Sequence, residues 1–356
     1  MRRDTVLFAA GGRPPCDSAL ELAFQVAELA PNLRLVWLGP GSESHLLNLP
    51  PFVYAPPRSG SHALELTRSR LMISTHGTSG ARRLPLMKTP ILQTFHAIPI
   101  KRLGNRNLRS NAVRRPQPTR WNFVLSPSEF YETEVIEALS WSGTRIRVPL
   151  PRYSLTQRVQ RVDSRLRLRR ILGLDPSTKI VMFAPTYRAS HDLGSFDPLS
   201  SHQLLARLLR DEYFILTRDH YLALAHNEDP EVSMGKELSA EDSLLVLSGC
   251  DVLVTDYSSL MVDAAFLDIP TVLLTPDIDL YERSPGLTIS IRQSAPGILT
   301  SCVASAAELV MEQTSKGFSP EFRQLLLAAA GLPDDPLVRL ASPFDRDSDL
   351  AALLAV

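Results

Sequence analysis

The stretch Asp251-Val-Leu-Val-Thr-Asp-Tyr-Ser-Ser-Leu-Met-Val-Asp263 decides the fold class that the sequence predicts. Its apolar run Val252–Val254 is typical of a buried parallel strand. Helical periodicity follows, because Leu260, Ala264 and Leu267 share one face at i, i+4 and i+7. The stretch therefore predicts a strand that leads directly into an amphipathic helix, whose first backbone N–H groups point above the sheet edge.

Two hydroxyl side chains, Ser258 and Ser259, lie where this strand meets the helix. The helix dipole and the free N–H groups favour a phosphate at such a position. The alternative is that Asp256 or a serine only caps the helix. The stretch taken alone leaves both interpretations open.

The same alternation of apolar runs and helical segments continues along the chain. In the first half the predicted strands are 5–10, 33–38, 71–74, 91–95 and 122–125, and the helices are 19–29, 61–70 and 129–139. In the second half the strands are 179–183, 213–217, 252–254 and 271–274, and the helices are 203–209, 242–247, 305–312, 322–330 and 350–355. Serial strand–helix units predict doubly wound parallel α/β sheets.

A proline pair, Pro149 and Pro151, interrupts this alternation and precedes an arginine-rich segment. We therefore predict two Rossmann-like domains that face a cleft, a division that the length of 356 residues also favours. The predicted boundaries are 1–150 for the first domain, 151–175 for the linker and its helix, 176–318 for the second domain and 319–356 for a helical tail.

The composition is that of a globular, cytosolic protein, with 44% hydrophobic and 21% charged residues. No apolar run approaches the roughly 20 residues of a membrane span, and the first run is too short for a signal peptide. The three cysteines are scattered, which argues against a zinc site or a disulfide framework.

The net charge of zero hides an asymmetry between the two halves of the chain. Residues 1–170 carry a balance of +15 and residues 171–356 a balance of −15. The excess is concentrated in Lys101–Arg120 and Arg145–Arg170, which predicts an anionic partner such as a phosphate polymer or an anionic membrane. The alternative for the second cluster is a solvated helix between the domains. Nucleic acid is not expected, because no aromatic side chains interleave the arginines of the first cluster.

Polar residues follow three strands of the predicted second domain. Ligands of open α/β sheets bind beyond the carboxyl ends of the strands, so we expect these residues to meet. They combine cations, hydroxyls and an imidazole, which suits a nucleoside diphosphate. They are Thr186, Arg188, Arg218, His220, Tyr221, Asp256, Ser258 and Ser259.

The first domain offers His96 after a predicted strand, followed by Pro99, Lys101 and Arg102. A histidine at a strand end is often only a surface residue. His76 occupies a similar position, so the sequence does not rank the two histidines.

The order of these motifs resembles a known family. The motifs are His96-x-x-Pro-x-Lys-x-x-Gly104, then Ala184-Pro-Thr-Tyr-Arg188, then Arg218-x-His-Tyr221, then Thr255-Asp-Tyr-Ser-Ser259, with Tyr281 and Gly286 after the last strand. Over roughly residues 70–300 the chain is similar to the CDP-glycerol glycerophosphotransferases, the teichoic-acid and capsule polymerases of GT-B fold. Ala97 and Ile98 depart from the family's small residues after the histidine. The family's arginine before the last glycine is displaced to Arg283.

The resemblance implies transfer of a polyol phosphate, most simply glycerol phosphate, from a CDP-polyol to an acceptor hydroxyl, with release of CMP. His96 and His220 would be the catalytic pair, and Ser258 and Ser259 would hold the pyrophosphate. Lys101 and Arg102 are further candidates for substrate binding. The acceptor would be an anionic polyol-phosphate chain or a lipid-linked phosphate. We expect no cofactor and little dependence on metal, although Asp256 or Asp263 could recruit Mg²⁺.

The sequence therefore predicts a cytoplasmic transferase that also attaches peripherally to the inner face of the membrane. Two alternatives stay open. One is a GT-B glycosyltransferase that uses a nucleotide sugar, and the other is a degenerate, non-catalytic binding protein. Neither the polyol nor the oligomeric state follows from the sequence.

Overall fold

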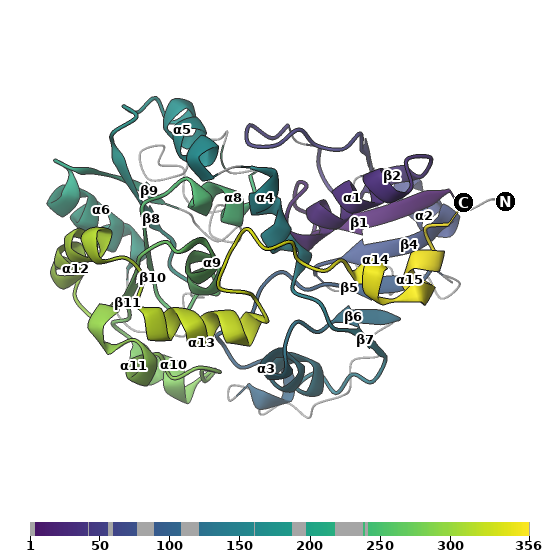
Figure 1. Ribbon diagram of the computed structural model, residues 1–356. Helices are drawn as coiled ribbons and strands as arrows, with labels where there is room; N and C mark the ends of the chain where they lie inside the picture. Colours follow the sequence, from purple (N-terminus) through teal and green to yellow (C-terminus); the bar gives the residue numbers. More distant parts are fainter. Residues whose placement is uncertain are drawn as a thin grey trace.

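The computed structural model describes residues 4–41, 43–55, 60–76, 89–107, 121–159, 161–186, 197–217, 238 and 241–355. Two parallel β-sheets, each flanked by helices, form the two halves of the molecule (Figure 1). The predicted fold class, two Rossmann-like α/β domains, is confirmed.

The first sheet has seven strands in the order β3-β2-β1-β4-β5-β6-β7, and all neighbours are parallel. The order reverses between β1 and β4, and such a reversal is where open α/β sheets bind ligands. The strands are β1 (Thr5–Ala9), β2 (Arg34–Trp37), β3 (Val53–Tyr54), β4 (Ser69–Ser74), β5 (Ile91–Gln93), β6 (Phe123–Leu125) and β7 (Thr144–Ile146).

The second sheet has five parallel strands in the order β12-β11-β10-β8-β9, and its order reverses between β8 and β10. The strands are β8 (Lys179–Phe183), β9 (Tyr213–Thr217), β10 (Val252–Thr255), β11 (Thr271–Leu274) and β12 (Leu299–Thr300). The predicted strands are present in both sheets. The sequence did not predict β3, β7 or β12, three short strands at the sheet edges.

Helices α1 to α11 lie between the strands in the chain, as the alternation predicts, and α12 to α15 follow the last strand. Their bounds are α1 (Asp17–Leu29), α2 (Gly60–Arg68), α3 (Glu129–Tyr131), α4 (Leu155–Arg158), α5 (Arg161–Ile171), α6 (Pro198–Leu209), α8 (Ser243–Ser248), α9 (Leu260–Leu267), α10 (Ile278–Arg283), α11 (Ile291–Ser294), α12 (Val303–Lys316), α13 (Pro320–Ala330), α14 (Pro343–Arg346) and α15 (Ser348–Ala352). The predicted helix 129–139 is α3 followed by a π-helix over Glu132–Glu137. Short 3₁₀ turns span Gly104–Arg106, Pro151–Ser154 and Pro296–Ile298.

The prediction that α9 is amphipathic is wrong. Seven of its eight residues, Met261–Leu267, are buried. The reason is tertiary, because α8 and α13 both pack against α9. A helix that is covered on several sides needs no polar face.

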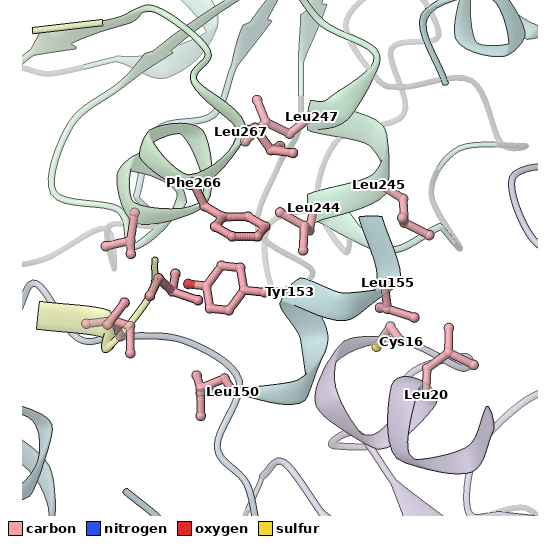
Figure 2. Packing of buried hydrophobic residues seen from close by; sticks show 14 of the residues in the cluster. Cys16, Leu20, Leu150, Tyr153, Leu155, Leu244, Leu245, Leu247, Phe266 and Leu267 are labelled. Atoms are coloured by element: carbon pink, nitrogen blue, oxygen red, sulfur yellow. The ribbon is translucent and has the colours of Figure 1, made fainter. Parts of the chain in front are cut away.

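One apolar core runs through both domains and the linker between them. Figure 2 shows that Tyr153 of the linker points toward the ring of Phe266 on α9, while Leu155 lies beside Cys16 and Leu20 of the first domain. The rings of Tyr153 and Phe266 are 5.0 Å apart. The linker therefore acts as a packing layer between the two domains.

The end of the chain returns from the second domain to the first (Figure 1). Arg70 of β4 donates a hydrogen bond to the carbonyl oxygen of Leu353, and Ser342 donates one to Gln25 of α1. The predicted domain boundaries at 150, 175 and 318 stay a proposal. Within the described ranges, no helix has the length and apolar character that a membrane crossing requires.

Candidate active site

Two histidines meet at the carboxyl edge of the first sheet. His76 follows β4, His96 follows β5, and these strands are neighbours. The imidazole rings stack with centroids 4.1 Å apart and an angle of 10° between their planes. Thr75 lies 2.6 Å from Nδ1 of His76. The structure thus brings together the two histidines that the sequence could not rank.

The side chain of His96 reaches solvent, although protein surrounds it. Desolvation by this protein lowers the pKa of His96 below its usual value, and the cations of Arg13 and Arg152 lower it further. Asp17 opposes the shift. The imidazole is therefore neutral near pH 7, as a base must be before it accepts a proton.

Asp17 is a carboxylate whose negative charge acts on both histidines. It begins α1 after β1, and it is almost fully buried. Its carboxylate pairs with Arg13 and lies 3.6 Å from Arg152. Burial alone would raise the pKa of Asp17, but these two cations outweigh it and lower the pKa to about 2. Asp17 is therefore ionised throughout the physiological range.

Arg152, in the linker, connects the two domains. It is 3% exposed. On the first domain it donates to the carbonyl oxygen of His96 and faces Asp17. On the second domain its Nη2 lies 3.1 Å from Asp263 and 3.8 Å from Asp242. One guanidinium thus joins the His96 loop to helix α9.

This buried cluster contains one more carboxylate than guanidinium groups. Its members are Arg13, Arg152, Asp17, Asp242 and Asp263. Burial raises the pKa of Asp263 to about 6, and Asp242 adds to the rise while Arg152 opposes it. Asp263 therefore takes up a proton more readily than Asp17 does.

Asp256 lies in the turn between β10 and α9. Its carboxylate accepts hydrogen bonds from the backbone N–H groups of Thr186 at 2.8 and 3.0 Å and of Tyr257 at 2.6 Å. It thereby ties the loop after β8 to the loop after β10, the two strands at the reversal of the second sheet. Tyr257 stacks on Tyr281 at 3.8 Å and donates to Asp277.

Ser258 and Ser259 follow Asp256 in this turn and are partly exposed. The Oγ of Ser258 accepts a hydrogen bond from the N–H of Leu260 at 3.3 Å. Ser259 occupies the cap position of α9, and its side chain makes no capping bond. Both hydroxyls therefore lie at the helix end where the sequence predicts a phosphate. Ser258 also caps this end through its bond with Leu260, as the alternative interpretation predicts.

Lys101 and Arg102 lie where the two domains pair by backbone. Lys101 forms an antiparallel bridge with Leu287, and the N–H of Arg102 donates to Gly286 at 3.0 Å. The Nε of Arg102 donates to the carbonyl oxygen of Leu287 at 3.1 Å. These contacts give both motif residues a structural role, and binding of substrate by their side chains stays a prediction.

Gly104, the glycine of the same motif, adopts φ +50°. A Cβ at this position would lie 2.1 Å from the carbonyl oxygen of Ala138. Only glycine fits both the conformation and the close approach.

Four candidate site residues lie outside the described ranges. They are Arg188, Arg218, His220 and Tyr221. Sequence reasoning missed Arg13, Asp17, Arg152 and Asp242 as parts of the site. The signals were a glycine pair with an arginine after the first strand, and an arginine directly after the linker prolines. Within the described ranges, no group of three or more metal-ligating side chains is placed to hold a metal.

The family model described as CDP-Glycerol:Poly(glycerophosphate) glycerophosphotransferase matches residues 1–321. The chain belongs to this family. The family assignment agrees with the resemblance found in the motifs.

Relatives in the family include two teichoic acid poly(glycerol phosphate) polymerases. The polymerase of Bacillus spizizenii is 27% identical over 258 residues, which is 64% of this chain and 64% of the relative. That of Staphylococcus epidermidis is 26% identical over 341 residues, which is 86% of this chain and 45% of the relative. The chain thus matches less than two thirds of the length of either relative.

Among solved structures, a histidine-to-asparagine variant of the wall teichoic acid polymerase TagF, soaked with CDPG, superposes with a TM-score of 0.75. It is 22% identical, and the superposition covers 99% of this chain and 89% of the other. This similarity confirms the GT-B-like fold of the family member described here.

Asp263 makes the stability of this family member depend on pH in a defined direction. Its pKa rises from 3.8 in the unfolded chain to about 6 in the folded protein. Between these values the folded protein binds the proton more tightly, so stability increases as pH falls. We predict that, as the pH falls from 7.5 to 5, the free energy of unfolding of the wild type rises by about 1 kcal/mol relative to that of Asp263→Asn.

Urea unfolding of both proteins at several pH values measures this difference. Asp268→Asn is the control, because Asp268 is an exposed carboxylate at the end of the same helix. A wild-type advantage that stays constant or shrinks toward pH 5 contradicts the prediction.

Proposed function

We propose that this protein transfers glycerol phosphate from CDP-glycerol to a hydroxyl group of an anionic acceptor, in the synthesis of a teichoic acid or a capsule polymer. The observation that carries the proposal is the position of Arg152. It contacts the carbonyl oxygen of His96 in one domain and Asp263 of α9 in the other. The guanidinium of Arg152 therefore holds together His96, the proposed base, and the N-terminal turn of α9, the proposed phosphate site.

In this reaction the acceptor oxygen attacks the phosphorus atom nearest the glycerol, and the bond from that phosphorus to CMP breaks. His96 accepts the proton of the acceptor hydroxyl, because its lowered pKa keeps it neutral. Ser258, Ser259 and the N-terminus of α9 bind the pyrophosphate. His220 is proposed to protonate or stabilise the phosphate of the departing CMP, as the family resemblance implies.

Thr186, Arg188, Arg218, Tyr221, Asp256, Lys101 and Arg102 are proposed to bind substrate. For Asp256 the contacts favour an indirect role, because its carboxylate already accepts from the N–H groups of Thr186 and Tyr257. It would shape the loops that hold the donor. The related proteins are named as poly(glycerol phosphate) polymerases, and one of the solved structures was soaked with CDPG, which supports this choice of donor and acceptor.

The catalytic assignment predicts the effect of replacing His96. His96→Ala should reduce the release of CMP from CDP-glycerol by about 10²–10⁴-fold, because the acceptor hydroxyl loses its base. The matched control is His45→Ala, since the side chain of His45 is exposed. The measurement uses a short glycerol-phosphate oligomer as the acceptor.

A rate within a factor of about three of wild type in His96→Ala contradicts the assignment. UDP-sugars serve as alternative donors in the same assay. Turnover of a UDP-sugar and not of CDP-glycerol identifies a glycosyltransferase, and binding of CDP-glycerol without turnover identifies a degenerate binding protein.

We also propose a cytoplasmic location with peripheral attachment to anionic membranes, supported by the excess of basic residues in the first half. Several arginines of the cluster Arg145–Arg170 are held in ion pairs within the protein, as in Arg145 with Glu132 and Arg169 with Asp251. Arg106 of the cluster Lys101–Arg120 is likewise paired, with Glu134 and Glu137, so the described arginines do not rank the two clusters.

The attachment predicts flotation with vesicles that contain anionic lipid at 50 mM salt and release at 500 mM salt, since salt screens the attraction. Vesicles of neutral lipid are the control. Failure to float with anionic vesicles at low salt removes the membrane from the proposal.

A further inference from the structure

Three chain segments converge at the reversal of the first sheet. The loop after β1 leads to Asp17, the loop after β4 carries His76, and the loop after β5 carries His96. These three strands are neighbours in the order β1-β4-β5. Asp17 therefore shares the sheet edge where ligands of such folds bind with the two stacked imidazoles.

The backbone of Asp17 is strained. Its φ is +60°, which residues with a side chain rarely adopt. The conformation directs its N–H to Oδ2 of Asp242 in the other domain at 2.6 Å. Strain of this kind persists only where the surroundings impose it, and it is frequent at functional sites.

The loop before Asp17 also touches the histidine pair. Gly11 adopts φ +66°, and a Cβ there would lie 3.1 Å from the ring of His76. The segment from Gly11 to Asp17 thus packs on one imidazole and places a carboxylate in the field of both. The negative charge of Asp17 interacts with His96 and with His76.

The charged groups around His96 act in opposite directions on its pKa. The facing groups are Asp17 from α1, Arg13 from the loop before it, Arg152 from the linker and His76 from the loop after β4. Two imidazolium ions stacked at 4.1 Å would repel each other, so a proton on one ring disfavours a second proton on the other. Asp17 is the group in this set that favours the charged imidazole.

We propose that Asp17 is a positioning residue for His96. It fixes the stacked histidine pair and balances the positive charge that forms when His96 takes a proton. In the transfer reaction, which rests on the proposed function, the O–H bond of the acceptor breaks and an N–H bond forms on the imidazole. At the same time the acceptor oxygen bonds to phosphorus and CMP departs with the electrons of the broken P–O bond.

The test compares Asp17→Asn with Glu21→Gln. Asparagine tolerates a positive φ, so the first variant removes the charge and keeps the backbone. Glu21 is a buried carboxylate one turn further along α1 that pairs with Arg158, so the second variant is a matched loss of a buried ion pair away from His96.

Two quantities are measured in both variants and in the wild type. The first is the pH profile of kcat/KM for CDP-glycerol. The second is the titration of the histidine side chains by NMR, with the signal of His96 assigned from a His96→Gln sample. The NMR readout needs no turnover, so it decides the role of Asp17 even if the donor is not CDP-glycerol.

Asp17→Asn should lower kcat by about 10²-fold with little change in KM. The acidic limb of the profile should move to lower pH, because loss of the carboxylate lowers the pKa of His96. The NMR titration of His96 should move in the same direction, and Glu21→Gln should change neither curve.

A fall in activity with both curves unmoved indicates a merely structural role and overturns the proposal, as does an unaltered rate. Inactivity of the wild type with every CDP-polyol refutes the proposed function alone.

Discussion

The arrangement of the site depends on the guanidinium of Arg152. Buried between the domains, it contacts the carbonyl oxygen of His96 on one side and Asp263 of α9 on the other. A buried cation is costly unless carboxylates surround it, and Asp17, Asp242 and Asp263 supply that environment. Because these carboxylates belong to both domains, the cation is satisfied only when the two sheets are held together. The apolar packing of Tyr153 against Phe266 next to it strengthens the same contact (Figure 2).

The charge of this cluster connects structure with chemistry. Three carboxylates and two guanidinium groups leave one negative charge in excess, near the two stacked imidazoles. Such an environment can accept one proton at Asp263, whose pKa is raised to about 6, and Asp17 favours the charged form of His96. A transferase that removes a proton from an acceptor hydroxyl needs this property. The ionic network is thus both the connection between the domains and the electrostatic surroundings of His96, the proposed base.

The sequence predicted the fold because each buried strand is a short apolar run with turn residues at its ends, a local signal. It missed β3 and β7, because edge strands of two or three residues carry little pattern. It also described α9 as amphipathic, since the burial of this helix depends on α8 and α13, which are distant in sequence. Motif order indicated His96, Ser258 and Ser259. Arg152 and Asp17 were missed because a buried ion cluster drawn from four distant segments has no sequence spacing of its own.

The most direct test of the central role of Arg152 is urea unfolding of Arg152→Met beside Arg145→Met. Arg152→Met should lower the free energy of unfolding by about 3–5 kcal/mol at pH 8, because buried carboxylates of both domains lose their counter-ion. Arg145 is a fair reference, since its partner Glu132 keeps Arg147, and its loss should stay below about 1 kcal/mol. The excess loss should shrink at pH 5, where Asp263 is protonated. Equal losses for the two variants at both pH values contradict the account.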